Sequence, residues 1–211
     1  MDALHVVLLG DSIFDNASYS EPEPDVTTHL RSLLPAGTRA TLLAVDGAIA
    51  ATMTAQVPDI PRDATHLVVS IGGNDALGYQ SLLDMPAMST AAALRLFAKA
   101  VAGFEKDYRS AVRLVFDRGL PTTLCTIYNG AFEEPDFAAR ARVALMIFND
   151  VILRVAFEHH ASVIDLRLVC SHKGDYANPI EPSGQGGMKI AKAILRATGI
   201  RPPGRHTAAF C

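Results

Sequence analysis

Short apolar runs alternate along the chain with longer segments in which apolar residues recur every three or four positions. A short run of β-branched and aliphatic residues is typical of a buried strand in a parallel sheet. Apolar residues at helical spacing predict helices that cover such a sheet. The pattern predicts strands at 5–9, 41–45, 65–71, 122–128 and 162–166, and helices at 24–34, 89–118, 135–159 and 186–198.

This alternation predicts a three-layer α/β/α sandwich around about five parallel strands. No linker or repeat divides the chain, so we expect one domain, residues 1–200, followed by a C-terminal tail, residues 201–211. Met146, Phe148 and their neighbours in the predicted helix 135–159 are expected in the core. The irregular segment 170–183 is long for a connection, and such loops are often functional.

The composition supports a folded protein and excludes several kinds of partner. Of the 211 residues, 49% are hydrophobic and 19% are charged, which is enough apolar material for a core. A net charge of −3 without a long basic run makes nucleic acid a poor partner. No apolar run approaches membrane-spanning length, and the N-terminus does not resemble a secretory signal. We therefore expect a cytoplasmic protein with no membrane partner; the sequence does not indicate an oligomeric state.

The three cysteines, Cys125, Cys170 and Cys211, do not predict disulfides or a metal site. An odd number without paired spacing is not a disulfide framework. Cys125 lies in a predicted strand, where cysteine acts as a small apolar residue. Because no Cys-x-x-Cys pair or His/Cys cluster is present, we expect no metal and no cofactor.

Small and polar residues follow the predicted strands at their carboxyl ends, the edge where open parallel sheets bind ligands. A serine hydroxyl, glycine N–H groups and an asparagine amide are suited to acyl transfer. The hydroxyl attacks a carbonyl carbon, and the N–H groups stabilise the resulting oxyanion. The residues in question are 10–12, 46–47, 72–75 and 128–130, with Asp175, Asn178 and Glu181 in the loop after the last strand.

Three of these segments resemble the sequence blocks of the SGNH/GDSL hydrolases. Gly10-Asp11-Ser12 resembles block I, Gly47 resembles the glycine of block II, and residues 72–75 resemble the G-x-N-D of block III. Their order and spacing match over nearly the whole chain. The resemblance implies a flavodoxin-like sheet, ester hydrolysis and Ser12 as the nucleophile. It also implies an oxyanion hole from the backbone N–H groups of Ser12 and Gly47 and the side chain of Asn74.

The last block departs from the family pattern. Where the family has Asp-x-x-His and then proline, this chain has Asn178 and Glu181, followed by Pro182. A neutral Asn beside an ionised Glu carries the same charge as an ionised Asp beside a neutral His. We therefore hypothesise that the Asn178 amide donates a hydrogen bond to the Glu181 carboxylate.

Glu181 is accordingly the expected replacement base. A free Glu has a pKa of about 4.3 against about 6.5 for His, which makes it a weaker base. Desolvation would raise the pKa of Glu181, whereas a hydrogen bond from Asn178 would lower it. The sequence leaves both a slow hydrolase and an elevated pKa open.

Two other residues of this loop are candidates for the site. His172 would serve as the base if the loop folds inward, although an exposed position is the favoured interpretation. Asp175 is close to Glu181 in sequence, but no recognisable ligand spacing supports a metal site there.

The leading hypothesis is a serine hydrolase that cleaves a small-molecule carboxylic ester. The absence of an obvious large lid favours small or accessible esters. The alternatives are a catalytically impaired binding protein that keeps the fold and an acyltransferase that uses the same acyl-enzyme. Activity that depends on Ser12 separates the first two, and acyl transfer to an acceptor other than water identifies the third.

Overall fold

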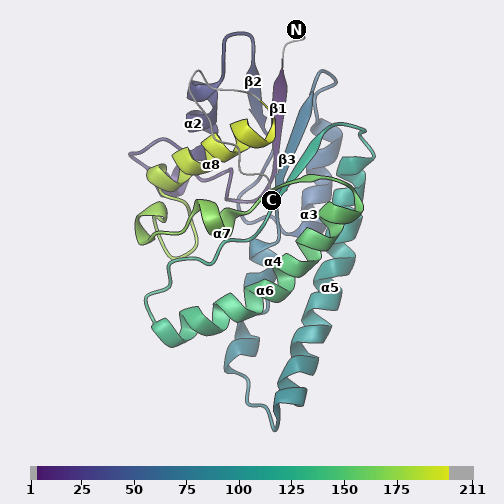
Figure 1. Ribbon diagram of the computed structural model, residues 1–211, viewed down its shortest axis with the longest axis vertical. Helices are drawn as coiled ribbons and strands as arrows, with labels where there is room; N and C mark the ends of the chain where they lie inside the picture. Colours follow the sequence, from purple (N-terminus) through teal and green to yellow (C-terminus); the bar gives the residue numbers. More distant parts are fainter. Residues whose placement is uncertain (1–3, 200–211) are drawn as a thin grey trace.

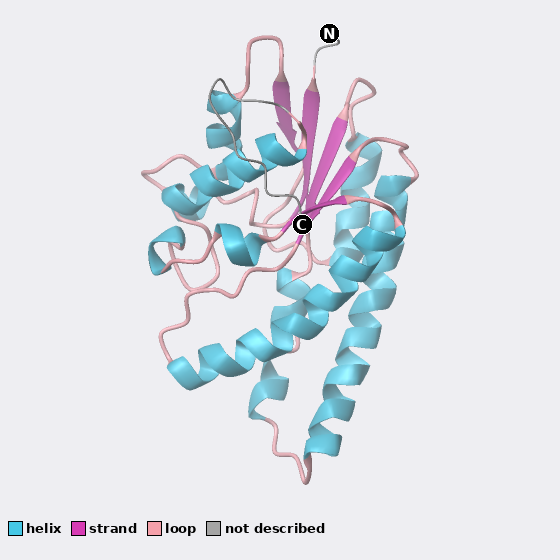
Figure 2. Ribbon diagram, viewed as in Figure 1, coloured by secondary structure: helices cyan, strands magenta, loops and turns pink. Residues whose placement is uncertain are grey.

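Five strands form one parallel sheet in the computed structural model, which describes residues 4–199 (Figure 2). The order β2-β1-β3-β4-β5 is that of flavodoxin-like folds, and each neighbouring pair runs parallel. The predicted three-layer sandwich with five parallel strands is therefore confirmed. The predicted tail, residues 201–211, lies outside the described residues. The strands are β1 (His5–Gly10), β2 (Arg39–Leu42), β3 (His66–Ser70), β4 (Thr122–Cys125) and β5 (Ser162–Ile164).

Helices cover both faces of the sheet (Figure 1). Side chains alternate along a strand, so Val6 and Leu8 of β1 enter the core on one face and Val7 and Leu9 the core on the other. Burial on both faces explains why β1 has a continuous apolar sequence. The first face carries α2 (Val26–Leu33), α7 (Leu166–Val169) and α8 (Gly184–Ala197); the second carries α3 (Ala50–Met53), α5 (Thr90–Phe116) and α6 (Pro135–Glu158).

The remaining helical segments are single turns or little more, and the hydrophobic pattern did not predict them. Segments this short lack the several turns that make a helical period visible. They are α1 (Ala17–Ser20), η1 (Thr54–Asp59), α4 (Gly73–Leu77), η2 (Gln80–Asp84) and η3 (Lys173–Asp175).

The strand β4 ends at Cys125, short of the predicted end at residue 128. The reason lies in α6. The Asn149 side chain accepts a hydrogen bond from the Ile127 N–H (2.7 Å) and donates one to the Ile127 carbonyl (2.8 Å). An asparagine thus replaces the neighbouring strand as the partner of this backbone, and the chain leaves the ladder toward the carboxyl edge.

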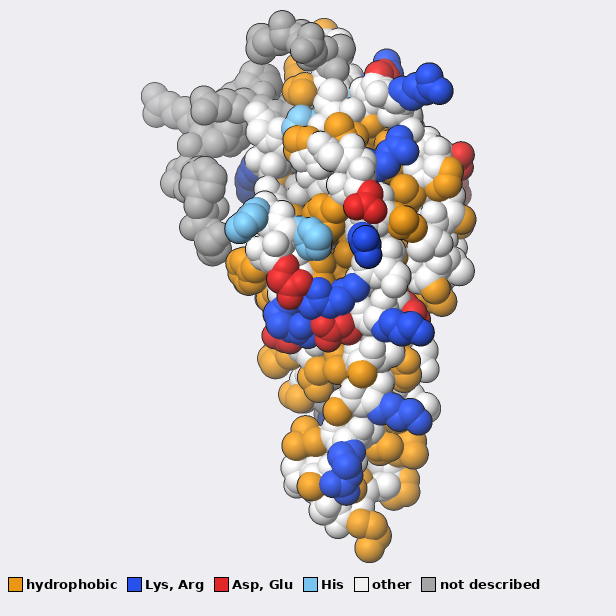
Figure 3. Space-filling model, turned by 90° about the vertical axis from the view of Figure 1, so that its right-hand side faces the viewer, with side chains coloured by type: hydrophobic (Ala, Val, Ile, Leu, Met, Phe, Trp, Pro, Cys, Tyr) orange, Lys and Arg blue, Asp and Glu red, His pale blue; other side chains and the backbone are white. Residues whose placement is uncertain are grey.

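The two long helices α5 and α6 continue past the carboxyl edge of the sheet (Figure 1). Glu105 of α5 joins them, because it accepts hydrogen bonds from Arg109 on its own helix and from Arg154 on α6. Figure 3 shows the molecule from the right-hand side of Figure 1, and its narrow lower end carries mainly apolar and basic side chains. Within residues 4–199, no helix has the length and hydropathy that crossing a membrane requires.

The predicted core position is confirmed for Phe148, which is 2% exposed, and is wrong for Met146, which is 53% exposed. Two positions along a helix correspond to a rotation of about 200° around its axis, so these two side chains point to nearly opposite sides. Only one of them can face the sheet, and Phe148 does so.

Candidate active site

The carboxyl end of β1 holds Ser12 in a fixed position. Gly10 has φ +129°, and a Cβ there would lie 1.7 Å from the carbonyl oxygen of Ser70, so no other residue fits. The Gln56 side chain pairs with both the N–H and the carbonyl of Gly10, at 2.8 Å each. The Asp11 N–H then donates to the Ser70 carbonyl (3.0 Å). The turn that carries Ser12 is thereby tied to β3 and η1.

Ser12 and Glu181 are hydrogen-bonded although 169 positions separate them in the sequence. The Ser12 hydroxyl donates to Oε1 of Glu181 at 2.9 Å. Both residues are buried, with Ser12 6% and Glu181 5% exposed. Within residues 4–199, Oε2 of Glu181 has no hydrogen-bond partner. A carboxylate in this position can accept the serine proton directly.

Burial changes the ionisation of the two carboxyl groups at the site. Desolvation raises the pKa of Glu181 to about 7, although the hydrogen bond from Ser12 opposes this shift. Desolvation also raises the pKa of Asp11 to about 8, and the negative charges of Glu181 and Asp75 add to the effect. Asp11 is therefore largely neutral at pH 7, while Glu181 is divided between its two forms.

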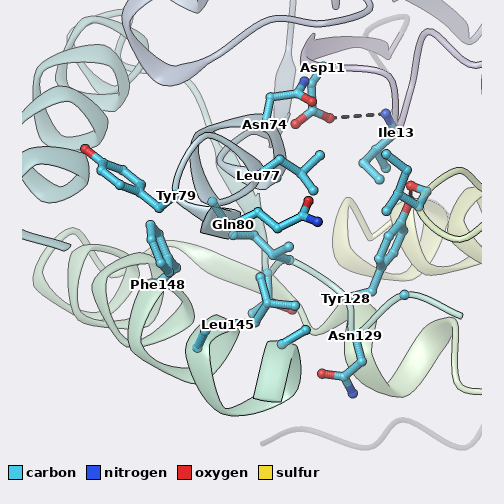
Figure 4. A pocket seen from close by; sticks show the side chains of 18 of the residues that line it. Asp11, Ile13, Asn74, Leu77, Tyr79, Gln80, Tyr128, Asn129, Leu145 and Phe148 are labelled. Carbon is cyan, nitrogen blue, oxygen red and sulfur yellow. Dashed lines mark hydrogen bonds between the residues drawn. The ribbon is translucent and has the colours of Figure 1, made fainter. Parts of the chain in front are cut away.

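Asp11 has a structural role in the turn. Its Oδ1 accepts a hydrogen bond from the Ile13 N–H at 3.1 Å, which fixes the backbone on either side of Ser12 (Figure 4). A Cβ added at Gly73, the residue before Asn74, would lie 3.8 Å from Oδ2 of Asp11, so the two segments are adjacent.

Asn178 shapes the loop that carries Glu181. Its Oδ1 accepts hydrogen bonds from the N–H groups of Ile180 and Glu181, both at 2.9 Å. Asn178 is exposed, and the Glu181 N–H that it binds belongs to the backbone. The hypothesis that its amide donates to the Glu181 carboxylate is therefore wrong: an Asx turn satisfies the asparagine oxygen locally and holds the backbone.

The structure does not bring His172 or Asp175 to Ser12. His172 is exposed, and its backbone N–H donates to Oδ2 of Asp175 (3.0 Å). Asp175 is fully buried and pairs with Lys189 of α8 (2.5 Å). Burial alone would raise the pKa of Asp175, but the hydrogen bonds from Lys189 and His172 outweigh it and lower the pKa. In the part of the chain described, no group of three or more His, Cys, Asp or Glu side chains is placed to hold a metal ion.

Asn74 connects the loop of Gly47 to the cavity that contains Ser12. The Asn74 Nδ2 donates to the carbonyl of Ala48 (2.9 Å), directly after Gly47, and Asp75 accepts the Ala50 N–H (3.0 Å). Neither the Ser12 N–H nor the Gly47 N–H donates to another backbone group of residues 4–199. One N–H of the Asn74 amide also remains free for a ligand, since the group has two.

A cavity extends from Ser12, Asn74 and Glu181 into the space between α4, η2, α5 and α6. Figure 4 shows Asp11 and Asn74 at one end, Tyr79 and Phe148 on one side, and Tyr128 and Asn129 on the opposite side. The volume of the cavity that is open to the centres of water-sized groups is about 100 Å³. The site therefore includes an interior space as well as the open sheet edge.

Most of the side chains that form this cavity were not singled out from the sequence. The sequence predicts Phe148 only as an apolar core residue. The helical segments α4 and η2 are too short to be predicted from it. The one available indication is α6 itself, where apolar residues occupy more than the face that covers the sheet.

The parallel sheet and the order of the segments at its carboxyl edge are those of the SGNH/GDSL hydrolases. The sequence model of the GDSL-like Lipase/Acylhydrolase family matches residues 8–186, and the chain belongs to this family. A search of curated proteins found no match.

Several solved structures share the fold at low sequence identity. An extracellular lipase from Streptomyces rimosus has a TM-score of 0.71 at 17% identity, with 92% of this chain and 100% of that chain covered. A phospholipase A1 from Streptomyces albidoflavus NA297 has a TM-score of 0.67 at 16% identity, covering 92% and 99%. An acetylxylan esterase from Geobacillus stearothermophilus has a TM-score of 0.67 at 18% identity, covering 95% and 98%.

Proposed function

We propose that this protein is a serine esterase in which Glu181 replaces the histidine base of the family. The observation that carries the proposal is the 2.9 Å hydrogen bond from the Ser12 hydroxyl to the buried Glu181 carboxylate. A pKa of about 7 makes this carboxylate a far stronger base than an ordinary glutamate. The family's lipases and esterases support ester cleavage as the reaction.

In the proposed first step, Ser12 Oγ bonds to the ester carbonyl carbon while its proton passes to Glu181. The backbone N–H groups of Ser12 and Gly47 and the free N–H of Asn74 stabilise the oxyanion. Collapse of this intermediate breaks the bond to the alcohol oxygen, which takes the proton from Glu181 and leaves as the alcohol.

The second step hydrolyses the acyl-enzyme. Water attacks the acyl carbon and gives one proton to Glu181, and the tetrahedral intermediate then releases Ser12 Oγ, which recovers that proton. The carboxylic acid leaves and the enzyme returns to its starting state. One carboxylate therefore serves as base and acid in both half-reactions without an orienting third residue.

The test is hydrolysis of a short-chain p-nitrophenyl ester by wild type, Ser12→Ala and Glu181→Gln. Loss of activity in both variants, by about 1,000-fold or more, is expected for a nucleophile and its base. Glu181→Gln is nearly isosteric, so circular dichroism and thermal unfolding should show a folded protein. His172→Ala, at an exposed position of the same loop, is the matched control and should retain activity.

Each alternative has its own outcome in this experiment. Wild type that does not hydrolyse esters of any length favours a binding protein with the same fold. Ser12-dependent acyl transfer to an added alcohol that is faster than hydrolysis favours an acyltransferase. Full activity in Glu181→Gln together with inactive His172→Ala would replace Glu181 by His172 as the base.

A further inference from the structure

The cavity next to Ser12 has two chemically different parts. Its acidic groups, Asp11 and Glu181, line it together with Ser12 at the reacting end. The part between η2, α5 and α6 is formed mainly by apolar and aromatic side chains, with the amide of Gln80 from η2 among them (Figure 4). Of the residues that line the whole cavity, none is Lys, Arg or His, and the acidic ones are Asp11 and Glu181. The residues that characterise the apolar part are Leu83, Phe97, Phe137, Ala144, Leu145 and Phe148.

This lining favours a hydrocarbon chain over a polar group. A hydroxyl-rich group such as a sugar would lose its water here and find few hydrogen-bond partners, which is unfavourable. Each methylene that moves from water into such a space improves binding by about fourfold. The apolar part therefore discriminates by the length of the chain that enters it.

The cavity is larger than an acetyl group requires. The centres of water-sized groups have about 100 Å³ available. A single such group needs only about 10–15 Å³, so the space takes several methylene-sized groups beyond the acetyl carbons.

The acyl side of the ester is the part that benefits from this cavity. The acyl group takes part in both half-reactions, first as part of the ester and then bonded to Ser12, whereas the alcohol leaves between them. A binding site that is continuous with Ser12 therefore contributes to both steps only if it holds the acyl chain.

We infer that the cavity between η2, α5 and α6 binds the acyl chain of a fatty acyl ester whose chain is several methylenes longer than acetyl. The inference rests on the proposed function of Ser12 and names the substrate class of the same site. Acetylated sugars, whose acyl group has two carbons, leave the apolar part empty.

Two isomeric substrates test this directly. Ethyl octanoate and octyl acetate have the same atoms and similar hydrophobicity, but the long chain is on the acyl side only in the first. We expect kcat/KM for ethyl octanoate to be at least about tenfold higher, because several methylenes enter the cavity and each improves binding by about fourfold. Equal rates, or faster cleavage of octyl acetate, would overturn the inference while leaving the serine esterase intact.

A variant within the cavity provides the second test. Ala144→Phe adds a ring where Ala144 of α6 lines the apolar part, and Ala139→Phe adds the same ring at an exposed position of that helix. Ala144→Phe should lower the ratio of octanoyl to acetyl ester kcat/KM by at least about tenfold, since the ring takes the place of several methylenes. Ala139→Phe should keep the wild-type ratio. An unchanged ratio in Ala144→Phe would contradict the assignment.

Binding without catalysis separates this inference from the proposed function. Ser12→Ala should bind methyl octanoate, measured by calorimetry, at least about tenfold more tightly than methyl acetate. If the variant binds in this way but wild type cleaves no ester, the proposed function is contradicted and the acyl-chain site is supported. Equal or undetectable binding of the two esters by folded Ser12→Ala would contradict the acyl-chain site.

Discussion

Asn178 contacts Glu181 through the backbone: its side-chain oxygen accepts the Glu181 N–H at 2.9 Å and leaves the carboxylate to Ser12. The same oxygen accepts the Ile180 N–H, so Asn178 fixes the turn from which the Glu181 side chain projects. An aspartate could form both of these hydrogen bonds as well. The asparagine found here is thus compatible with a purely positional role.

The first prediction separates position from charge at residue 178. Asn178→Asp keeps an oxygen that can accept both hydrogen bonds and adds an exposed negative charge, which should raise the pH midpoint of activity by less than about 0.7 units. Asn178→Ala removes this oxygen and with it both hydrogen bonds, each worth about 0.5–1.5 kcal/mol, and should lower kcat/KM by about tenfold or more with the midpoint almost unchanged. The measurement is kcat/KM against pH for both variants. A large midpoint shift in Asn178→Ala would show that Asn178 acts on the charge of Glu181.

The second prediction concerns the pH dependence of the reaction. Because the base must be ionised and burial raises the pKa of Glu181 to about 7, kcat/KM should fall as pH drops below 7. The fall should approach tenfold for each pH unit, so that about 1% of the plateau remains at pH 5. An ordinary glutamate with a pKa near 4.3 would still be on its plateau there.

The control for this pH limb is His172→Ala, because a histidine base would titrate in the same range. The variant should keep the wild-type profile. Disappearance of the limb in His172→Ala would assign the titration to His172, and a flat profile down to pH 5 would show that Glu181 is not perturbed as described.

The sequence predicts the layers of this fold better than it predicts the site. The five strands and four main helices follow from hydrophobic periodicity, which long or fully buried elements carry clearly. The end of β4 was missed because Asn149, remote in sequence, takes over the hydrogen bonds of Ile127. The contact of Ser12 with Glu181 was expected only through family resemblance, since nothing local connects positions so far apart.

The apolar cavity next to Ser12 is the part of the site that the sequence did not predict. It depends on how α4 and η2 are placed against α5 and α6, and that placement is a tertiary property. Phe148 illustrates the difficulty: packing into the core and lining a cavity require the same kind of residue. Apolar side chains that surround a space cannot be distinguished by pattern from those that fill one.

The third prediction tests the close contact beneath Ser12. Gly10→Ala would place a Cβ 1.7 Å from the Ser70 carbonyl oxygen at φ +129°, so β1 and β3 would have to separate. We expect a loss of more than about 4 kcal/mol, or a protein that does not fold. Gly37→Ala is the matched control, because Gly37 also has a positive φ, +83°, but nothing lies within 4 Å of its added Cβ.

Gly37→Ala should cost only about 1–2 kcal/mol, the price of a left-handed conformation alone. Thermal unfolding measures both variants, and at about 2–4 °C for each kcal/mol the two should differ by several degrees. Similar melting temperatures for the two variants would show that the contact of Gly10 with Ser70 is easily relaxed.

The last prediction follows from the buried carboxyl group of Asp11. Its pKa is about 8 in the folded protein, raised mainly by desolvation, against about 3.9 in an unfolded chain. Between these values the folded state keeps a proton that the unfolded state has lost, so stability is fully present below about pH 4 and is lost as pH rises toward 8. Glu181 contributes with the same sign up to about pH 7.

Asp11→Asn removes the ionisable group and keeps an oxygen that can accept the Ile13 N–H. Chemical denaturation should therefore show wild type and variant closest in stability below about pH 4, where the carboxyl group is mostly protonated in both states. The variant should become progressively more stable than wild type toward pH 8, by up to a few kcal/mol. A difference that stays constant from pH 4 to pH 8 would mean that Asp11 ionises normally in the folded protein, and the turn that holds Ser12 would then carry a buried negative charge beside Glu181.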